Sequence, residues 1–111
     1  MFEKNVNSAA TTNGQRVMTP QRGGEIWSIT CSNSGAAAAF VKIYDVVDVV
    51  VGTTVPILVI GVPPGGNTHM QFLKGLQFRV GLSLAITNLG PDADTTAVLA
   101  GQVKACIVYG G

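Results

Sequence analysis

The chain has 111 residues, of which 12% are charged and 47% are hydrophobic, and its formal net charge is +1. Chains of this length form one domain and bury roughly 65% of the surface of the unfolded chain. Globular proteins carry about 25% charged residues, so this chain is poor in charge, and its hydrophobic content excludes disorder. We therefore expect other subunits to cover part of its surface. Nucleic acid is excluded as a main partner because phosphate binding needs a basic face.

The N-terminal residues do not form a secretory signal, because they contain Glu3 and Lys4 and no apolar core segment. The longest apolar tract, 46–62, is too short for a membrane span and is interrupted by Asp48, Gly52, Thr53, Thr54 and Pro56. We therefore expect a soluble protein that is made inside the cell and has no membrane partner.

Residues 1–24 differ from the rest because they are rich in Asn, Ser, Thr, Gln and Gly. This composition predicts an extended arm with a short strand at Arg16–Thr19, closed by Pro20. Such an arm either frays or ties one subunit to the next. The chain therefore divides into an arm, 1–24, and a β-sandwich domain, 25–111. The isolated apolar residues of the arm are Val6, Val17 and Met18.

The first strand of the domain is predicted at Glu25–Cys31, where alternate residues share one face. The residues predicted on that face are Trp27, Ile29 and Cys31. Four alanines, 36–39, could start a helix. The β-branched and aromatic residues of Phe40–Asp45 follow them without a cap and favour a strand instead.

The segment Val46–Val51 is the most unusual feature of the sequence, because an exposed connection should not carry five valines. One interpretation is a longer strand that folds back on itself. The other is an exposed apolar ridge that docks on another subunit. The run Pro56–Val62 is continuously apolar, which predicts a strand that is buried on both faces. Pro63–Asn67 ends that strand.

A short strand at Thr68–Leu73 and a turn at Lys74-Gly75 precede the clearest alternation, Leu76–Ile86. Every second residue there is apolar, which predicts one long strand with its apolar face in the core. The other face would be outward, with Gln77, Arg79, Ser83 and Thr87.

The C-terminal part contains a loop rich in Gly, Pro and Asp, 88–96, and a last strand, Gln102–Tyr109. No segment shows capped helical periodicity. About seven short strands predict an all-β fold, a single β-sandwich or jelly-roll-like domain.

No catalytic, metal or cofactor site is predicted. His69 is the only histidine, and nothing orients a nucleophile toward it. Cys31 and Cys106 are expected on opposite faces as reduced thiols, and with one His they cannot supply a zinc site. We expect no enzymatic activity.

Asp92 and Asp94 resemble a calcium loop that lacks its terminal Glu, which favours turn chemistry over a weak cation site between subunits. Lys42 and Tyr44 share one strand face, and Lys104 and Arg79 are expected on outward faces, which is a weak indication of a small basic patch. Tyr44 is the only starting point for a carbohydrate site. The aromatic residues are spread over the strands, which indicates a core distribution.

Seven short sequence blocks follow one another over about 24–109. They are Gly24–Trp27, Val41–Tyr44, Val62–Gly66, Gly75–Phe78, Gly81–Thr87, Asp92–Thr96 and Val108–Tyr109. This order resembles small virion structural proteins of tailed bacteriophages. The resemblance implies a β-sandwich that attaches to a phage particle, and we favour a capsid decoration (cement) protein that forms a trimer. A tail, neck or fibre component, or a surface carbohydrate- or receptor-binding module, is the alternative. The family carries no catalytic residues that could be transferred to this chain.

On this hypothesis the partners are the major capsid protein or other virion proteins, and further copies of the chain. The protein would be made in the host cytoplasm and would lie on the capsid surface. The predicted interface combines the valine segment with the apolar residues of the arm. Its residues are Val46, Val47, Val49, Val50, Val51, Val6, Val17 and Met18.

Overall fold

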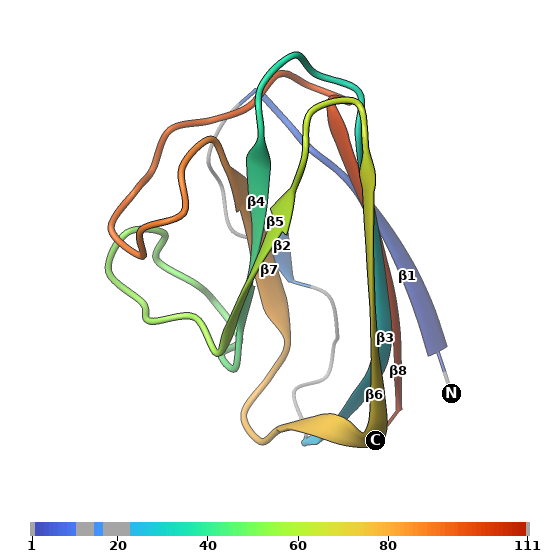
Figure 1. Ribbon diagram of the computed structural model, residues 1–111. Coiled ribbons are helices and arrows are strands. Elements are labelled where there is room, and N and C mark those ends of the chain that lie inside the picture. The colour runs from blue at the N-terminus through green and yellow to red at the C-terminus, as the bar shows by residue number, and fades with distance from the viewer. Residues whose placement is uncertain (1, 11–14, 17–22, 111) are drawn as a thin grey trace.

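A computed structural model describes residues 2–10, 15–16 and 23–110, and this part of the chain forms an all-β sandwich (Figure 1). Two four-stranded antiparallel sheets face each other, which confirms the predicted fold class. The first sheet has the order β1-β8-β3-β6 and the second sheet has the order β2-β7-β4-β5. The strands are β1 (Phe2–Asn7), β2 (Gln15–Arg16), β3 (Gly24–Asn33), β4 (Ala39–Tyr44), β5 (Leu58–Val62), β6 (Asn67–Phe78), β7 (Ser83–Thr87) and β8 (Val103–Gly110).

The described N-terminal residues are extended, as predicted, but they are part of the first sheet. Strand β1 pairs with β8 along its whole length, and Val6 is opposite Ala105 and buried in the core. Strand β2 overlaps the strand predicted at Arg16–Thr19 only at Arg16, and residues 17–20 lie outside the described part. The boundary between arm and domain at residue 24 stays a prediction.

A β-bulge changes which residues of β3 face the core. The pairing of β3 with both neighbours shifts register between Ile26 and Ser28. An extra residue in a strand reverses its alternation at that point. Ile26 and Ile29 are therefore both buried, whereas Trp27 is only half-buried. The prediction that Trp27 shares a core face with Ile29 and Cys31 is wrong.

The long strand predicted over Leu76–Ile86 is two strands in different sheets. Strand β6 continues through the expected turn at Lys74-Gly75, and the chain then crosses to β7 over residues 79–82. The backbone N–H groups of three successive residues donate to Asp45 Oδ1 at this crossing. They belong to Arg79 (2.9 Å), Val80 (2.8 Å) and Gly81 (3.3 Å).

The apolar alternation persists across the crossing because both sheets face the same core. Phe78, Leu82, Leu84 and Ile86 are buried, but Val80 is exposed. Ser83 and Thr87, predicted on an outward polar face, are fully buried. Loops cover the outer face of the second sheet, so β7 is buried on both faces.

Strand β5 is an edge strand, and the prediction that it is buried on both faces is wrong. It pairs only with β4 among the described strands. Ile60 and Val62 face the core, whereas Val59 faces outward and is exposed. The run is continuously apolar although only one of its faces is covered by this chain.

The core lies between the two sheets and contains almost entirely aliphatic side chains. Its buried members include Ile26, Ile29, Val41, Ile43, Phe78, Leu82, Leu84 and Ile107. Cys31 is buried there, and Cys106 is half-buried on the opposite face of the first sheet. Both thiols are free, as predicted.

Candidate functional site

Two long loops form an additional layer on the outer face of the second sheet, on the left in Figure 1. The first loop connects β4 to β5 (45–57), and the second connects β7 to β8 (88–102). They touch at Gly52, where a Cβ atom would lie 2.6 Å from Thr95 Cγ2 and 3.3 Å from the Ala93 carbonyl oxygen. Gly52 also has φ 91°, a conformation that favours glycine.

Lys42 lies beneath the second loop and is fully buried. Its Nζ donates to the carbonyl oxygens of Pro91 (2.7 Å) and Asp94 (3.2 Å). Burial lowers the pKa of Lys42, and the carboxylates of Asp94 and Asp92 partly offset that shift. Lys42 therefore cannot belong to the small basic patch considered from the sequence, because its ammonium group ties the loop to the sheet.

Tyr44 lies on the same face of β4 and is also fully buried. Its hydroxyl has no hydrogen-bond partner in the described part of the chain. Burial and the charge of Asp92 raise its pKa. Tyr44 is not exposed, so it cannot start the carbohydrate site that the sequence considered there.

The loop that contains Asp92 and Asp94 is held by turn chemistry, the interpretation favoured from the sequence. Asp94 Oδ2 accepts from Leu89 N (3.1 Å), Thr96 N (3.3 Å) and Thr96 Oγ1 (2.7 Å). Burial opposes ionisation of this carboxyl, but these bonds and Lys42 outweigh it and lower the pKa. Among the described residues, no group of three or more His, Cys, Asp or Glu side chains could hold a metal ion.

The valine segment is part of the first loop and contains no strand, so the interpretation as a folded-back strand is wrong. Ser83 Oγ donates to the carbonyl oxygens of Val46 (2.9 Å) and Val47 (2.8 Å), which fixes the start of the loop. Of the five valines, only Val50 is exposed, and the other four are half-buried.

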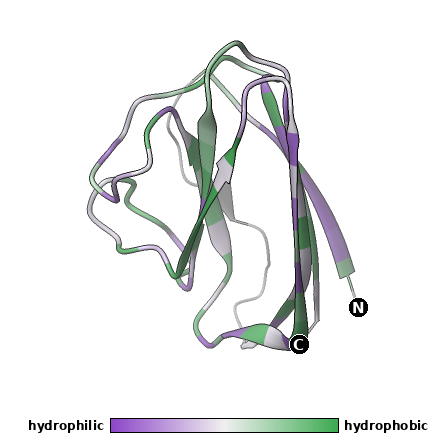
Figure 2. Cartoon of the chain, in the orientation of Figure 1, coloured by the Kyte–Doolittle hydropathy of each residue, from purple (hydrophilic) through white to green (hydrophobic). Residues whose placement is uncertain are grey.

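The exposed apolar residues of this region form what we call the apolar flank. They are Val50 (60% exposed), Val55 (71%), Ile57 (41%) and Val59 (36%). The Thr54 backbone N–H donates to Val50 O at 2.9 Å, which closes a turn between Val50 and the residues that lead into β5. Figure 2 contrasts the hydrophobic lower part of β5 with the mostly hydrophilic β1. Val55 is missing from the predicted interface because its exposure depends on how the loop folds.

The predicted interface residues are thus not brought together. Val50 belongs to the apolar flank, whereas Val6 is buried between the sheets of this chain. Val17 and Met18 lie outside the described residues.

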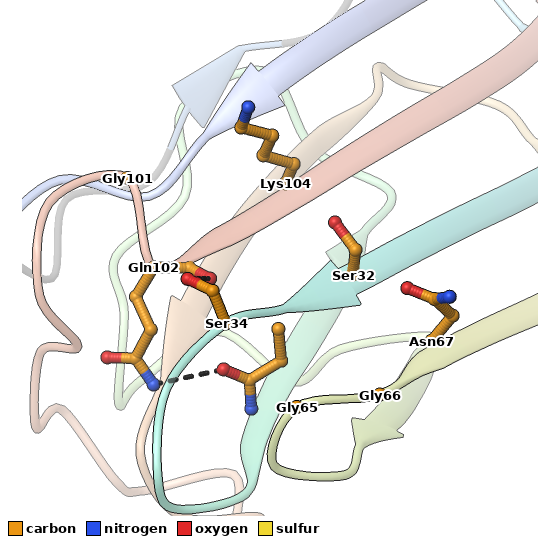
Figure 3. A pocket seen from close by; sticks show the side chains of 9 residues that line it. Ser32, Ser34, Gly65, Gly66, Asn67, Gly101, Gln102 and Lys104 are labelled. Atoms are coloured by element: carbon orange, nitrogen blue, oxygen red, sulfur yellow. Dashed lines mark hydrogen bonds between the residues drawn. The ribbon is translucent and has the colours of Figure 1, made fainter.

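A polar groove lies on the outer face of the first sheet and is formed by two adjoining depressions of about 400 and 390 Å³. Both depressions include Ser32 and Lys104. The first, shown in Figure 3, is closed by the turns around Ser34, Gly65 and Gly101. The second continues toward β1 and includes Asn5, Asn7, Thr30 and Cys106.

Asn33 fixes the end of this groove. Its Oδ1 accepts from Gly35 N (2.9 Å) and from Gln102 Nε2 (3.2 Å), the latter drawn in Figure 3. Its Nδ2 donates to the carbonyl oxygens of Ala37 (2.9 Å) and Val62 (3.2 Å). All four hydrogen-bonding positions of this buried amide are used, so it is a rigid support.

The histidine and the outward thiol have separate partners on this face. His69 Nδ1 lies 2.8 Å from Thr30 Oγ1, and Cys106 Sγ donates to Glu3 Oε1 at 3.3 Å. Burial, together with Glu3, raises the pKa of Cys106, which keeps the thiol protonated. A reactive cysteine needs the opposite shift.

No known family model matches this chain, and no curated protein sequence matches it. One solved structure with a similar chain trace is the coat protein of Tobacco streak virus, at 9% sequence identity and a TM-score of 0.37. The alignment covers 95% of this chain and 84% of the coat protein. A score this low supports no conclusion about fold or function. The described residues include no helix that is long and apolar enough to cross a membrane.

Proposed function

We propose that this chain is a non-enzymatic virion structural protein, and specifically a capsid decoration (cement) protein. It would bind the assembled shell through its apolar flank and its N-terminal segment, as a homo-oligomer for which we favour a trimer. The observation that carries the proposal is the apolar flank. Four aliphatic side chains are exposed within ten residues, 50–59, on a chain that has only 12% charged residues.

The apolar flank supplies the binding energy in this proposal. Burial of apolar surface contributes about 25 cal/mol per Å², so each 100 Å² covered by a partner gains about 2.5 kcal/mol before the entropy cost of association is subtracted. The contact is repeated at every copy, and a shell would be stabilised mechanically by the sum of such contacts. The loop that carries most of the flank is tied down through Ser83, and the second loop, which touches it at Gly52, is tied down through Lys42.

The flank is also next to the open edge of β5. Edge strands are commonly protected by charged residues or proline. Strand β1 carries Glu3 and Lys4, whereas β5 has the sequence LVIGV and contains neither protection. An unprotected apolar edge is expected where another subunit covers it. The sequence blocks that resemble tailed-phage virion proteins support the same function, with a tail, neck or fibre component as the alternative position.

The test combines light scattering after size exclusion with co-sedimentation on particles of the virus that encodes the chain. We expect a symmetric oligomer and saturable binding. Val55→Asp together with Val59→Asp should abolish particle binding. Val80→Asp is the matched control, because Val80 is equally apolar and exposed but lies at the crossing between the sheets. A strict monomer at high concentration that does not bind particles would refute the proposal.

A further inference from the structure

We propose that the polar groove on the first sheet binds a hydroxyl-rich carbohydrate that carries a carboxylate, with Lys104 pairing with the carboxylate. This inference goes beyond the assembly function and does not depend on it, because the groove and the apolar flank lie on different sheets.

The strand register places the outward side chains of the groove in two rows. Direct cross-strand partners form the first row, which is Asn7, Lys104, Ser32 and Asn67. The second row within the groove is Asn5, Cys106 and Thr30, and His69, the cross-strand partner of Thr30, lies beyond its lining. Strands lie about 4.8 Å apart, so the first row extends about 14 Å across the four strands. This distance accommodates more than one sugar unit.

Several polar groups of the first row are available to a ligand. The side chains of Ser32, Asn67 and Lys104 form no hydrogen bond with other described residues. The backbone at this end of the groove is held by two hydrogen bonds, from Asn33 Nδ2 to Val62 O and from Gln102 Nε2 to Asn33 Oδ1. At the rim, Gly65 and Gly101 leave open space where a side chain would otherwise point. Free donors and acceptors therefore stand on a rigid support, as specific polar recognition requires.

The chemistry of the lining selects the class of ligand. Hydroxyl and amide groups both donate and accept hydrogen bonds, and sugar hydroxyls match them in both roles. Lys104 is the only lysine, arginine or carboxylate side chain that lines either depression. One cation suits a single carboxylate, whereas a polyphosphate or nucleic acid needs several. No aromatic side chain lines the groove for stacking, so we expect weak binding. For a monosaccharide that carries a carboxylate, the expected dissociation constant is about 1 mM.

The experiment is an NMR titration of the full-length, ¹⁵N-labelled protein with sodium D-glucuronate. The matched probes are D-glucose, which lacks the carboxylate, sodium acetate, which lacks the hydroxyl groups, and inorganic phosphate. Glucuronate should shift the amide signals of Ser32, Asn67 and Lys104. Glucose and acetate should bind about tenfold more weakly.

Two lysine variants separate the groove from general surface charge. Lys104→Gln should weaken glucuronate binding about tenfold and leave glucose binding unchanged. Lys74→Gln is the control, because Lys74 is exposed on β6 and does not line the groove. An Asn67→Ala variant should weaken both sugars.

Three results would overturn the inference. One is the absence of shifts in the groove at about 50 mM glucuronate, far above the expected dissociation constant. Another is binding of acetate or phosphate as tight as that of glucuronate, which would indicate a simple anion site. The third is an equal loss of binding in Lys74→Gln. None of these results affects oligomerisation or particle binding, so failure of this inference is distinct from failure of the assembly proposal.

Discussion

The ammonium nitrogen of Lys42 lies 2.7 Å from the carbonyl oxygen of Pro91, although 49 residues separate the two in the chain. This bond and the one to Asp94 O connect the middle of a central strand to the loop that covers it. Burial of an ammonium group is costly unless it is well paired, and here two carbonyl oxygens and two nearby carboxylates offset part of that cost.

Lys42→Met is expected to destabilise the protein by about 1–3 kcal/mol, because the two carbonyl oxygens lose their donor beneath the loop. Removal of the buried charge offsets part of this loss. Denaturant unfolding gives the free energy, and hydrogen exchange should show faster opening of 88–96. Lys74→Met, at an exposed lysine, should change stability by less than about 0.5 kcal/mol. Equal effects of the two substitutions would contradict the role of Lys42.

Stability should fall on acidification through protonation of Asp94. The folded protein holds the pKa of this carboxyl below its ordinary value, so the unfolded chain binds more protons in the pH range between the two pKa values. The contribution of Asp94 is present above the unfolded pKa and is lost as the pH falls through the lowered folded pKa. Asp94→Asn should flatten the acid limb of a thermal-stability profile. Asp92→Asn leaves the three bonds to Asp94 Oδ2 in place, and an identical flattening by that variant would refute the assignment.

Gly52→Ala should destabilise the protein more than Gly65→Ala does. Both glycines have positive φ, which costs a side chain about 1–2 kcal/mol. Only at Gly52 would the added methyl group collide with the other loop, at Thr95 Cγ2, whereas nothing lies within 4 Å at Gly65. Thr95→Ser removes that Cγ2 atom and keeps the hydroxyl, so it should rescue part of the extra loss. Chemical denaturation of the unchanged protein, Gly52→Ala, Gly65→Ala and the double variant of Gly52→Ala with Thr95→Ser tests this. The absence of rescue in the double variant would mean that the loops do not touch there.

The two thiols should react at very different rates with an aromatic disulfide reagent. Cys31 is fully buried, and burial, with a smaller effect of Cys106, raises its pKa to about 11. In the folded protein only Cys106 should react, and slowly, because burial and Glu3 raise its pKa. Glu3→Gln should lower the pKa of Cys106 and accelerate its modification, and Cys31 should react only after unfolding. Unchanged kinetics in Glu3→Gln would show that the contact with Glu3 does not control this thiol.

The sequence by itself determined the fold class and most core-facing positions of the segment 76–86. Alternation with period two is a local property of a strand, and it marks Phe78, Leu82, Leu84 and Ile86 correctly as core residues. Cys31 and Cys106 fall on opposite faces for the same reason.

Only the tertiary structure decided which sheet each strand joins and which outer faces are covered. The apolar residues alternate without a break in the sequence from β6 to β7, although Val80 at the crossing is exposed, so the crossing held by Asp45 has no signature in the apolar pattern. Lys42, Ser83 and Thr87 appear surface-exposed by residue type, yet two loops distant in sequence bury them. The same loops expose Val50 and Val55. Burial of an outer face depends on contacts between distant segments, and a local pattern of residues does not record them.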